Sequence, residues 1–314
     1  MRNRLPSLDE AHVILFRRIF AARIFRHNVL ASGRPKGESF MPGSLPCRGQ
    51  IVVIKLGGSI LVRSKAYKRA AKFLSNRLRK HPDERLVVVV SAQEGTTDKL
   101  ERAARKIVSK PQAAALDLLW STGETRSVAI LALELEGLGV RAVPLNIHQT
   151  GLRAVAGRNE HSDFVETAEC NPEKLFKVLG KYPVAIVPGF FATDSEDAIA
   201  SLGRGGSDLA AVLLATGLQA CRCELIKDVP GYFTTDPHRD TNARHLPRLS
   251  FKEALQFADS GCDLVQRKAI DAAQRSRLPL IVRSLNENEP VSRIVETEQD
   301  KNWTDEIPSA VEAI

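Results

Sequence analysis

The sequence lacks several features that would direct the argument elsewhere. No apolar run among its 314 residues approaches the roughly 18 that a membrane-spanning helix needs. No secretory signal is evident, because arginines interrupt the apolar stretch near the amino terminus. There is no Cys-x-x-Cys pair, so the five cysteines are expected to be reduced thiols in a cytoplasmic protein rather than zinc ligands. They are Cys47, Cys170, Cys221, Cys223 and Cys262.

Positive charge is abundant but unevenly distributed. The formal net charge is +8, and residues 1–50 hold nine Lys or Arg against three acids, which places +6 in that segment. The remainder is nearly balanced, so the sequence argues against nucleic-acid binding by the folded body. Residues 13–30 have the pattern of a basic amphipathic helix, and residues 31–49 have the composition of a linker. A disordered extension, or an upstream start with Met41 as the true first residue, is favoured over an organelle-targeting leader.

The folded body is expected to span residues 51–294, with 295–314 as a tail. Residues 51–55 and 86–90 are continuous apolar runs, which are typical of strands buried on both faces. Further strands are predicted near residues 142–145, 184–187, 224–227 and 280–283, and a hairpin over 191–201. Helices are predicted near residues 65–80, 99–137, 172–179, 209–216, 251–259 and 264–275. In the long helical region, residues 120–124 are expected to interrupt the helix, so that Glu124 begins a new one.

Strands that alternate with helices predict an α/β protein with a largely parallel sheet covered on both faces. The ends of the strands collect polar side chains beside glycine-containing loops, namely Lys55, Ser91, Arg204, Asp208 and Asp228. In open α/β sheets, ligands bind outside the carboxyl ends of the strands. The sequence therefore predicts a ligand site at this edge.

The segment from Ser201 to Asp208 reads Ser-Leu-Gly-Arg-Gly-Gly-Ser-Asp. It is neither G-x-G-x-x-G nor a Walker A loop. Its glycines would let backbone N–H groups approach a ligand, and Arg204 is suited to grip a carboxylate or phosphate. Ser207 or Asp208 could cap the following helix. Taken alone, the segment fits either a phosphoryl-transfer site or a glycine-rich turn with a capping residue.

Taken in order, these segments resemble the aspartokinase branch of the amino acid kinase family over nearly all of residues 51–294. The family's Lys-x-Gly-Gly-Ser opening is matched at 55–59, its Val-Ser-Ala…Thr-Asp segment at 90–98 and its Gly-Glu pair at 123–124. Its Gly-Arg-Gly-Gly-Ser-Asp is unchanged at 203–208, and its Asp-Val…Asp-Pro nucleotide loop is similar to 228–237.

The resemblance implies a three-layer α/β/α sandwich and ATP-dependent phosphorylation of the side-chain carboxylate of aspartate, with Mg²⁺ on the phosphates. It implies that Lys55 neutralises the transferring phosphoryl group and that Asp208 orients Lys55. It also implies that Glu124 and Arg204 hold the ammonium and carboxylate of the amino acid, which Ser91 and Thr97 also contact. The residues it assigns to the nucleotide side are Gly57, Gly58, Ser59, Lys227, Asp228, Phe233, Asp236, His238 and Lys268.

The departures from the family pattern all lie on that nucleotide side. The usual lysine of Gly-Ala-Lys-Val-Leu-His-Pro is here Asp263, and the common Thr before the Asp-Val loop is Lys227. Phe233 and His238 replace the usual Tyr and Arg. Either Lys227 or Lys268 could supply the missing cation, and the sequence does not choose between them.

Three functions stay open at this point. An active aspartokinase is favoured over a related kinase with another acceptor and over a weakened kinase domain that serves as a binding or regulatory subunit. The family's paired ACT regulatory domains are expected to be absent. Lysine and threonine are therefore not expected to inhibit the chain, and regulation would need a separate partner. A homodimer is expected, without membrane or nucleic-acid partners.

Overall fold

The computed structural model describes residues 51–155, 164–165, 168–237 and 239–296. Internal contacts divide the chain into Met1–Leu45 and Pro46–Ile314, and every described residue belongs to the second unit. The predicted helix at 13–30, the carboxyl-terminal residues 297–314, Cys47 and His238 lie outside the described residues. None of the helices that are described is long and apolar enough to cross a membrane.

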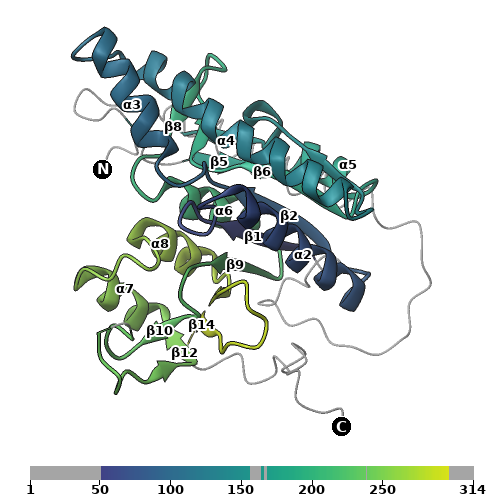
Figure 1. The fold of residues 1–314 in the computed structure, drawn as a ribbon, viewed down its shortest axis with the longest axis vertical. Helices are drawn as coiled ribbons and strands as arrows, with labels where there is room; N and C mark the ends of the chain where they lie inside the picture. Colours follow the sequence, from purple (N-terminus) through teal and green to yellow (C-terminus); the bar gives the residue numbers. More distant parts are fainter. Residues whose placement is uncertain (1–50, 156–163, 166–167, 238, 297–314) are drawn as a thin grey trace, which may run out of the picture. The chain divides into compact units, whose positions relative to one another are not determined.

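The centre of the described unit is an eight-stranded sheet in the order β12-β14-β13-β9-β1-β2-β6-β3 (Figure 1). Every neighbouring pair is parallel except β13 and β14. The strands are β1 (Ile51–Leu56), β2 (Arg85–Val90), β3 (Ala142–Pro144), β6 (Val184–Pro188), β9 (Arg222–Ile226), β12 (Arg248–Ser250), β13 (Leu280–Arg283) and β14 (Ser292–Val295).

Alternation along the strands builds two separate apolar layers, because successive side chains of a strand point to opposite faces. In β1, Val53 joins one buried cluster, whereas Val52 and Ile54 join the other. Lys55 follows the same alternation as Val53. Its ammonium therefore lies on the same side of the sheet as Val53.

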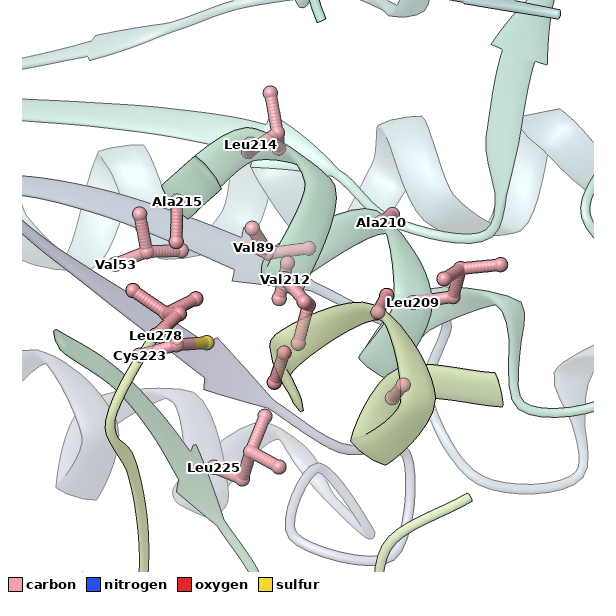
Figure 2. Close-up of a cluster of buried hydrophobic side chains, with 14 of the residues drawn as sticks. Val53, Val89, Leu209, Ala210, Val212, Leu214, Ala215, Cys223, Leu225 and Leu278 are labelled. Atoms are coloured by element: carbon pink, nitrogen blue, oxygen red, sulfur yellow. The ribbon is translucent and has the colours of Figure 1, made fainter. Parts of the chain in front are cut away.

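Helices cover both faces. The face of Val52 packs against α2 (Ser64–Lys80) and α4 (Ala113–Glu136). The face of Val53 packs against α5 (Glu173–Leu179), α6 (Gly206–Gly217), α7 (Phe251–Asp259) and α8 (Arg267–Ser276). Figure 2 shows the apolar side chains of α6 over β1, β2 and β9. The predicted three-layer α/β/α fold with a mainly parallel sheet is confirmed.

Smaller elements surround this core. A four-stranded sheet has the order β5-β4-β7-β8, in which β7 and β8 form the predicted hairpin. A two-stranded ribbon joins β10 and β11, and α3 packs on α4. Their bounds are β4 (Leu152–Ala154), β5 (Ala168–Cys170), β7 (Phe191–Thr193), β8 (Ile199–Ser201), β10 (Tyr232–Phe233), β11 (His245–Leu246), α3 (Thr96–Ile107) and the short 3₁₀ helix η1 (Ile147–Gln149).

The predicted interruption at residues 120–124 is wrong, because α4 continues through it from Ala113 to Glu136. Gly123 lies inside this helix and does not end it; glycine is suited to this position because the helix packs closely against its neighbours there. A Cβ there would lie 3.1 Å from Thr96 Cγ2 and 3.2 Å from Ala92 Cβ. Glu124 is therefore a buried mid-helix residue and not the first residue of a helix.

The predicted last strand is also not the last. β14 returns antiparallel beside β13, and β12 pairs parallel with β14 at the edge of the sheet. β14 has four residues, and β12 has three and runs directly into α7, so the two were not separated from the turn and helix residues around them. Cys170, Cys223 and Cys262 are free thiols in the part of the chain that the structure describes.

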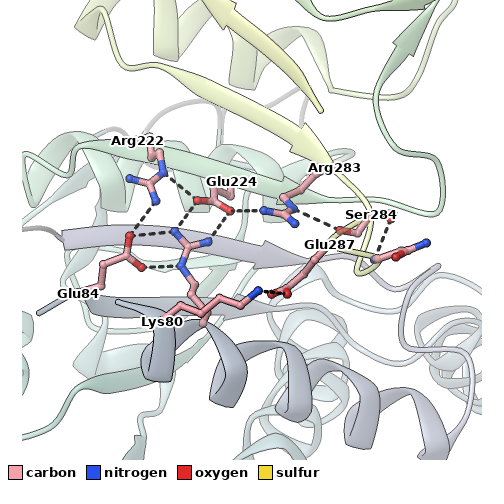
Figure 3. A network of polar contacts seen from close by, with 9 residues as sticks. Lys80, Glu84, Arg222, Glu224, Arg283, Ser284 and Glu287 are labelled. Atoms are coloured by element: carbon pink, nitrogen blue, oxygen red, sulfur yellow. Dashed lines mark hydrogen bonds and ion pairs between the residues drawn. The ribbon is translucent and has the colours of Figure 1, made fainter. Parts of the chain in front are cut away.

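A charged network is buried on the α2 face of the sheet (Figure 3). The guanidinium of Arg77 donates to Glu84 and, at 2.8 Å, to Glu224. Arg222 donates to the same two carboxylates at 2.8 Å each. Arg283 lies 3.9 Å from Glu224 and stacks over Phe73, with its Cζ 5.2 Å from the ring centroid. The network joins α2 to β9, to β13 and to Glu84, the residue just before β2.

Candidate active site

Two lysines share one carboxylate at the carboxyl ends of β1 and β9. Lys55 Nζ lies 2.7 Å from Asp208 Oδ1, and Lys227 Nζ lies 2.8 Å from Asp208 Oδ2. Lys55 belongs to β1, Lys227 follows β9, and Asp208 comes from the first turn of α6. Because β1 and β9 are parallel neighbours, their carboxyl ends bring the two ammonium groups to one place.

The start of α6 delivers Asp208 to this position. The expected cap by Ser207 or Asp208 is wrong: the helix begins at Gly206, and its N-cap is Gly205, with φ of 74° and no side-chain cap. A Cβ at Gly205 would lie 2.2 Å from Gln266 Cγ, so both the space and the backbone conformation require glycine. The carboxylate of Asp208 is therefore not used for capping and reaches the lysines.

Burial makes the charges of this cluster interdependent. Lys55 is 7% exposed and Asp208 is 2% exposed. Burial alone would raise the pKa of Asp208, but the charges of Lys55 and Lys227 outweigh it and hold that pKa well below its usual range. Burial lowers the pKa of Lys227, and Lys55 lowers it further, while Asp208 opposes both effects. A carboxylate between two ammonium groups leaves one net positive charge.

A pocket of about 290 Å³ lies beside the glycine turn after β1. It is lined by residues from three predicted motifs, namely Gly58, Ser59, Ser91, Thr97 and Glu124, together with Phe190 and with Ser207 of the Gly-Arg-Gly-Gly-Ser-Asp segment. Because Gly57, next to the pocket residue Gly58, borders the ammonium of Lys55, the pocket and the cluster are adjacent: a Cβ at Gly57 would lie 3.2 Å from Lys55 Nζ.

Glu124 is the buried acidic residue of this pocket, which the exposed Glu94 and Asp98 also line. It is 5% exposed, and its Oε2 is buried without a hydrogen-bond partner. Burial raises the pKa of Glu124 to about 7, opposed by backbone hydrogen bonds at Ala92 and Gly189 and by the charge of Lys55. A buried carboxylate with a free oxygen is a suitable partner for a cationic group of a ligand.

The two loops that form the mouth of the pocket approach closely. A Cβ at Gly58 would lie 3.0 Å from the carbonyl oxygen of Ala92, so the turn after β1 fits against the loop after β2 only with glycine. The suggestion that Thr97 caps α3 is wrong, because the N-cap is Gly95 and the helix begins at Thr96. Thr97 instead lines the pocket.

Other predicted residues do not line this pocket. Arg204, Asp228, Asp236 and Lys268 are exposed. Phe233 is half-buried in β10, where its ring packs against His245 with centroids 5.3 Å apart, and Asp236 lies 3.3 Å from Arg239. For these residues the assignment to substrate or nucleotide stays a prediction, and His238 lies outside the described part of the chain.

Sequence reasoning missed two features of the site. Phe190 lines the pocket and has φ of 69°, a conformation that is uncommon for a bulky residue. Its ring packs against Trp120, with centroids 6.1 Å apart. The Pro-Gly-Phe turn at 188–190, which follows a predicted strand, was the sequence feature that could have indicated Phe190 as a site residue. The second feature is the pairing of Lys227 with Asp208, which follows from the alignment of β1 with β9 and not from any local motif.

Comparison with known proteins agrees with this arrangement. The model of the amino acid kinase family matches residues 50–284, and the chain belongs to that family. It is 36% identical to an aspartokinase of Geobacillus stearothermophilus over 76% of this chain and 57% of that protein. It is also 36% identical to an aspartokinase of Thermus thermophilus, over 81% of this chain and 62% of that one.

Among solved structures, the aspartate kinase from Synechocystis is 31% identical, with a TM-score of 0.67 over 79% of this chain and 40% of that chain. The predicted family is thus confirmed. The chain spans less than two thirds of the length of the curated aspartokinases described above.

Proposed function

We propose that this chain transfers the γ-phosphoryl group of ATP to the side-chain carboxylate of L-aspartate, which gives 4-phospho-L-aspartate and ADP. A carboxylate oxygen attacks the γ-phosphorus, and the bond from that phosphorus to the β,γ-bridging oxygen breaks. The acceptor carboxyl has an ordinary pKa of about 3.9 and is already ionised at neutral pH, so no general base is required. The protein then has to align the reactants and neutralise charge.

The observation that carries the proposal is the pocket that contains Glu124 beside the buried Lys55–Asp208 pair. An amino acid substrate brings an ammonium group, which suits the buried carboxylate of Glu124. Ser91 and Thr97 supply hydroxyls in the same pocket. The transferring phosphoryl group would then meet Lys55, whose positive charge stabilises the charge that develops on it.

Magnesium is proposed to enter as the complex with ATP. The described residues contain no group of three or more His, Cys, Asp or Glu side chains that could hold a metal, and both oxygens of Asp208 face lysines. The close glycine turn at Gly57 and Gly58 fits phosphate oxygens, because backbone N–H groups can approach them without obstruction.

A hydroxamate-trapping assay tests the proposal, because hydroxylamine captures an acyl phosphate as it forms. Purified protein is incubated with ATP, Mg²⁺ and either aspartate, glutamate or N-acetylglutamate, and ADP release is followed in parallel. Turnover with aspartate is expected. Turnover with another acceptor alone would favour the related-kinase alternative. Binding of nucleotide without turnover on any acceptor would favour the binding-subunit alternative.

A homodimer and a separate regulatory partner chain are also part of the proposal. Light scattering of the purified chain tests the first, and co-purification from the native source tests the second.

A further inference from the structure

The aspartate at position 263 leaves the proposed site without one of the positive charges that the family pattern implies. By the resemblance described above, Asp263 stands where the family's usual pattern has a lysine, and Asp263 is exposed in the loop before α8. Transfer of a phosphoryl group spreads negative charge over its three equatorial oxygens. A single ammonium beside a carboxylate would leave no net positive charge at that place.

Two lysines near this region could supply the missing positive charge, and they differ in exposure and in the groups that they contact. Lys268 is exposed on the first turn of α8. The side chain of Lys227 is only 12% exposed, and its ammonium is fixed 2.8 Å from Asp208 Oδ2. Lys227 reaches the carboxylate that also holds Lys55, whereas Lys268 stands on an element whose buried side chains face the core.

The position of Lys227 is set by the pairing of β9 with its two neighbouring strands, β1 and β13. Lys55 pairs with Leu225 in the register of β1 and β9, so Lys227 lies just beyond the end of β9 and two residues past that partner. Its backbone N–H donates to the carbonyl oxygen of Arg283 at 2.8 Å, which holds this turn against β13. The turn is therefore fixed on both sides, by β13 through the backbone and by Asp208 through the side chain.

We infer that Lys227 is a second catalytic lysine that, together with Lys55, neutralises the transferring phosphoryl group, in place of the lysine that Asp263 has replaced. Asp208 holds both ammonium groups in the absence of nucleotide. When ATP binds, the γ-phosphate oxygens take the remaining N–H donors of the two lysines. The inference rests on the proposed phosphoryl transfer but not on the identity of the acceptor.

The test compares three variants in the full chain. Lys227→Met removes the charge, Lys227→Arg keeps it, and Lys72→Met removes an exposed lysine of α2 as a matched control. Loss of one charge-stabilising contact typically lowers kcat by about 10²–10³-fold. We expect that loss in Lys227→Met with a KM for the acceptor within about threefold of wild type. Partial recovery is expected in Lys227→Arg, and wild-type kcat in Lys72→Met. Circular dichroism checks that each variant is folded.

A second measurement separates contact with phosphate from support of the fold. ADP, Mg²⁺ and aluminium fluoride together mimic the nucleotide with its transferring group, whereas ADP with Mg²⁺ lacks that group. Lys227→Met should weaken binding of the fluoride complex by about 10²-fold or more and leave binding of ADP within about threefold. Equal weakening of both, or a wild-type kcat in Lys227→Met, would overturn the inference. So would loss of transfer in Lys268→Met with transfer retained in Lys227→Met.

Failure of this inference is distinguishable from failure of the proposed function. If the wild-type chain turns over glutamate and not aspartate, the proposed acceptor is wrong, and the same variants are measured with glutamate. If the wild-type chain releases no ADP with any acceptor and binds the fluoride complex no better than ADP, both proposals fail. If the wild type is active and only the Lys227 results disagree, the second lysine alone is rejected.

Discussion

The ionisation of Glu124 should make binding of the amino acid depend on pH near neutrality. Its pKa is raised to about 7 because burial disfavours the carboxylate. If the substrate ammonium binds only the ionised form, affinity follows the ionised fraction and falls as the pH drops through 7. From pH 8 to pH 6 that fraction decreases about tenfold, which corresponds to about 1.4 kcal/mol. Neither the side chain nor the ammonium of aspartate titrates in this range, so Glu124 is the source of the change.

The measurement is calorimetric titration with aspartate in the presence of ADP, repeated between pH 5.5 and pH 8.5. Glu124→Gln should weaken binding at pH 8 by roughly 10–150-fold, since a hydrogen bond to a charged group contributes about 1.5–3 kcal/mol. It should also remove the tenfold change between pH 8 and pH 6. Glu136→Gln, at the exposed end of the same helix, is the matched control and should keep both the affinity and the pH dependence of the wild type.

Two results would refute this reasoning. One is an affinity for aspartate that stays constant from pH 8 to pH 6 in the wild type. The other is a Glu124→Gln variant whose affinity keeps the same pH dependence, which would assign the titration to another group.

Three further predictions concern the lysine cluster, the buried network and the start of α6. Lys55→Met should lower kcat by about 10²–10³-fold with an unchanged circular dichroism spectrum; a kcat near wild type would remove Lys55 from the mechanism. Glu224→Gln should lower the free energy of unfolding in urea by about 3 kcal/mol at pH 7, because the charges of Arg77 and Arg222 outweigh burial and hold the pKa of Glu224 at about 2, below its ordinary value of 4.5. That stabilisation should be complete above pH 4.5 and disappear as the pH falls towards 2. Glu287→Gln, which removes the surface partner of Lys80, should cost less than about 1 kcal/mol, and equal losses in the two variants would contradict the argument. Gly205→Ala should destabilise the protein by about 1–3 kcal/mol, measured by the same urea titration, because φ of 74° disfavours a side chain and the Cβ would clash with Gln266. A urea unfolding curve identical to that of the wild type would show that the turn accommodates the added methyl group.

The core of the fold was predictable because its strands are continuous apolar runs that a helix follows or precedes. Residues 51–55, 86–90 and 280–283 were all identified as strands, and α7 was predicted with the bounds that the structure has. The short strands β4, β5 and β12 were not, since they form only by pairing with strands elsewhere along the chain. No local window of sequence contains those neighbours.

The candidate site also has parts that were predictable from sequence and parts that were not. Motif residues such as Ser91, Thr97 and Glu124 were identified, and the structure brings them to one pocket. The helix around Glu124 was mispredicted, because Gly123 resembles a helix break although it actually marks close packing against Ala92. The choice between Lys227 and Lys268 depended on which strand lies beside β1, and strand order is a property of the tertiary structure.

The buried network of Arg77, Glu84, Arg222, Glu224 and Arg283 also bears on how the sheet assembles. Within β9, Glu224 faces α2, while Cys223 and Leu225 face the apolar layer of α6. If β9 paired with β1 one residue out of register, the carboxylate of Glu224 would turn into that apolar layer without an arginine. Misaligned pairing is thus disfavoured at Glu224, in the middle of β9 and about 10 Å along the chain from Lys227, at about 3.3 Å per residue. The ion pair between Arg77 of α2 and Glu224 therefore favours the native register of β9 with β1. That register places Lys55 and Lys227 beside the same carboxylate.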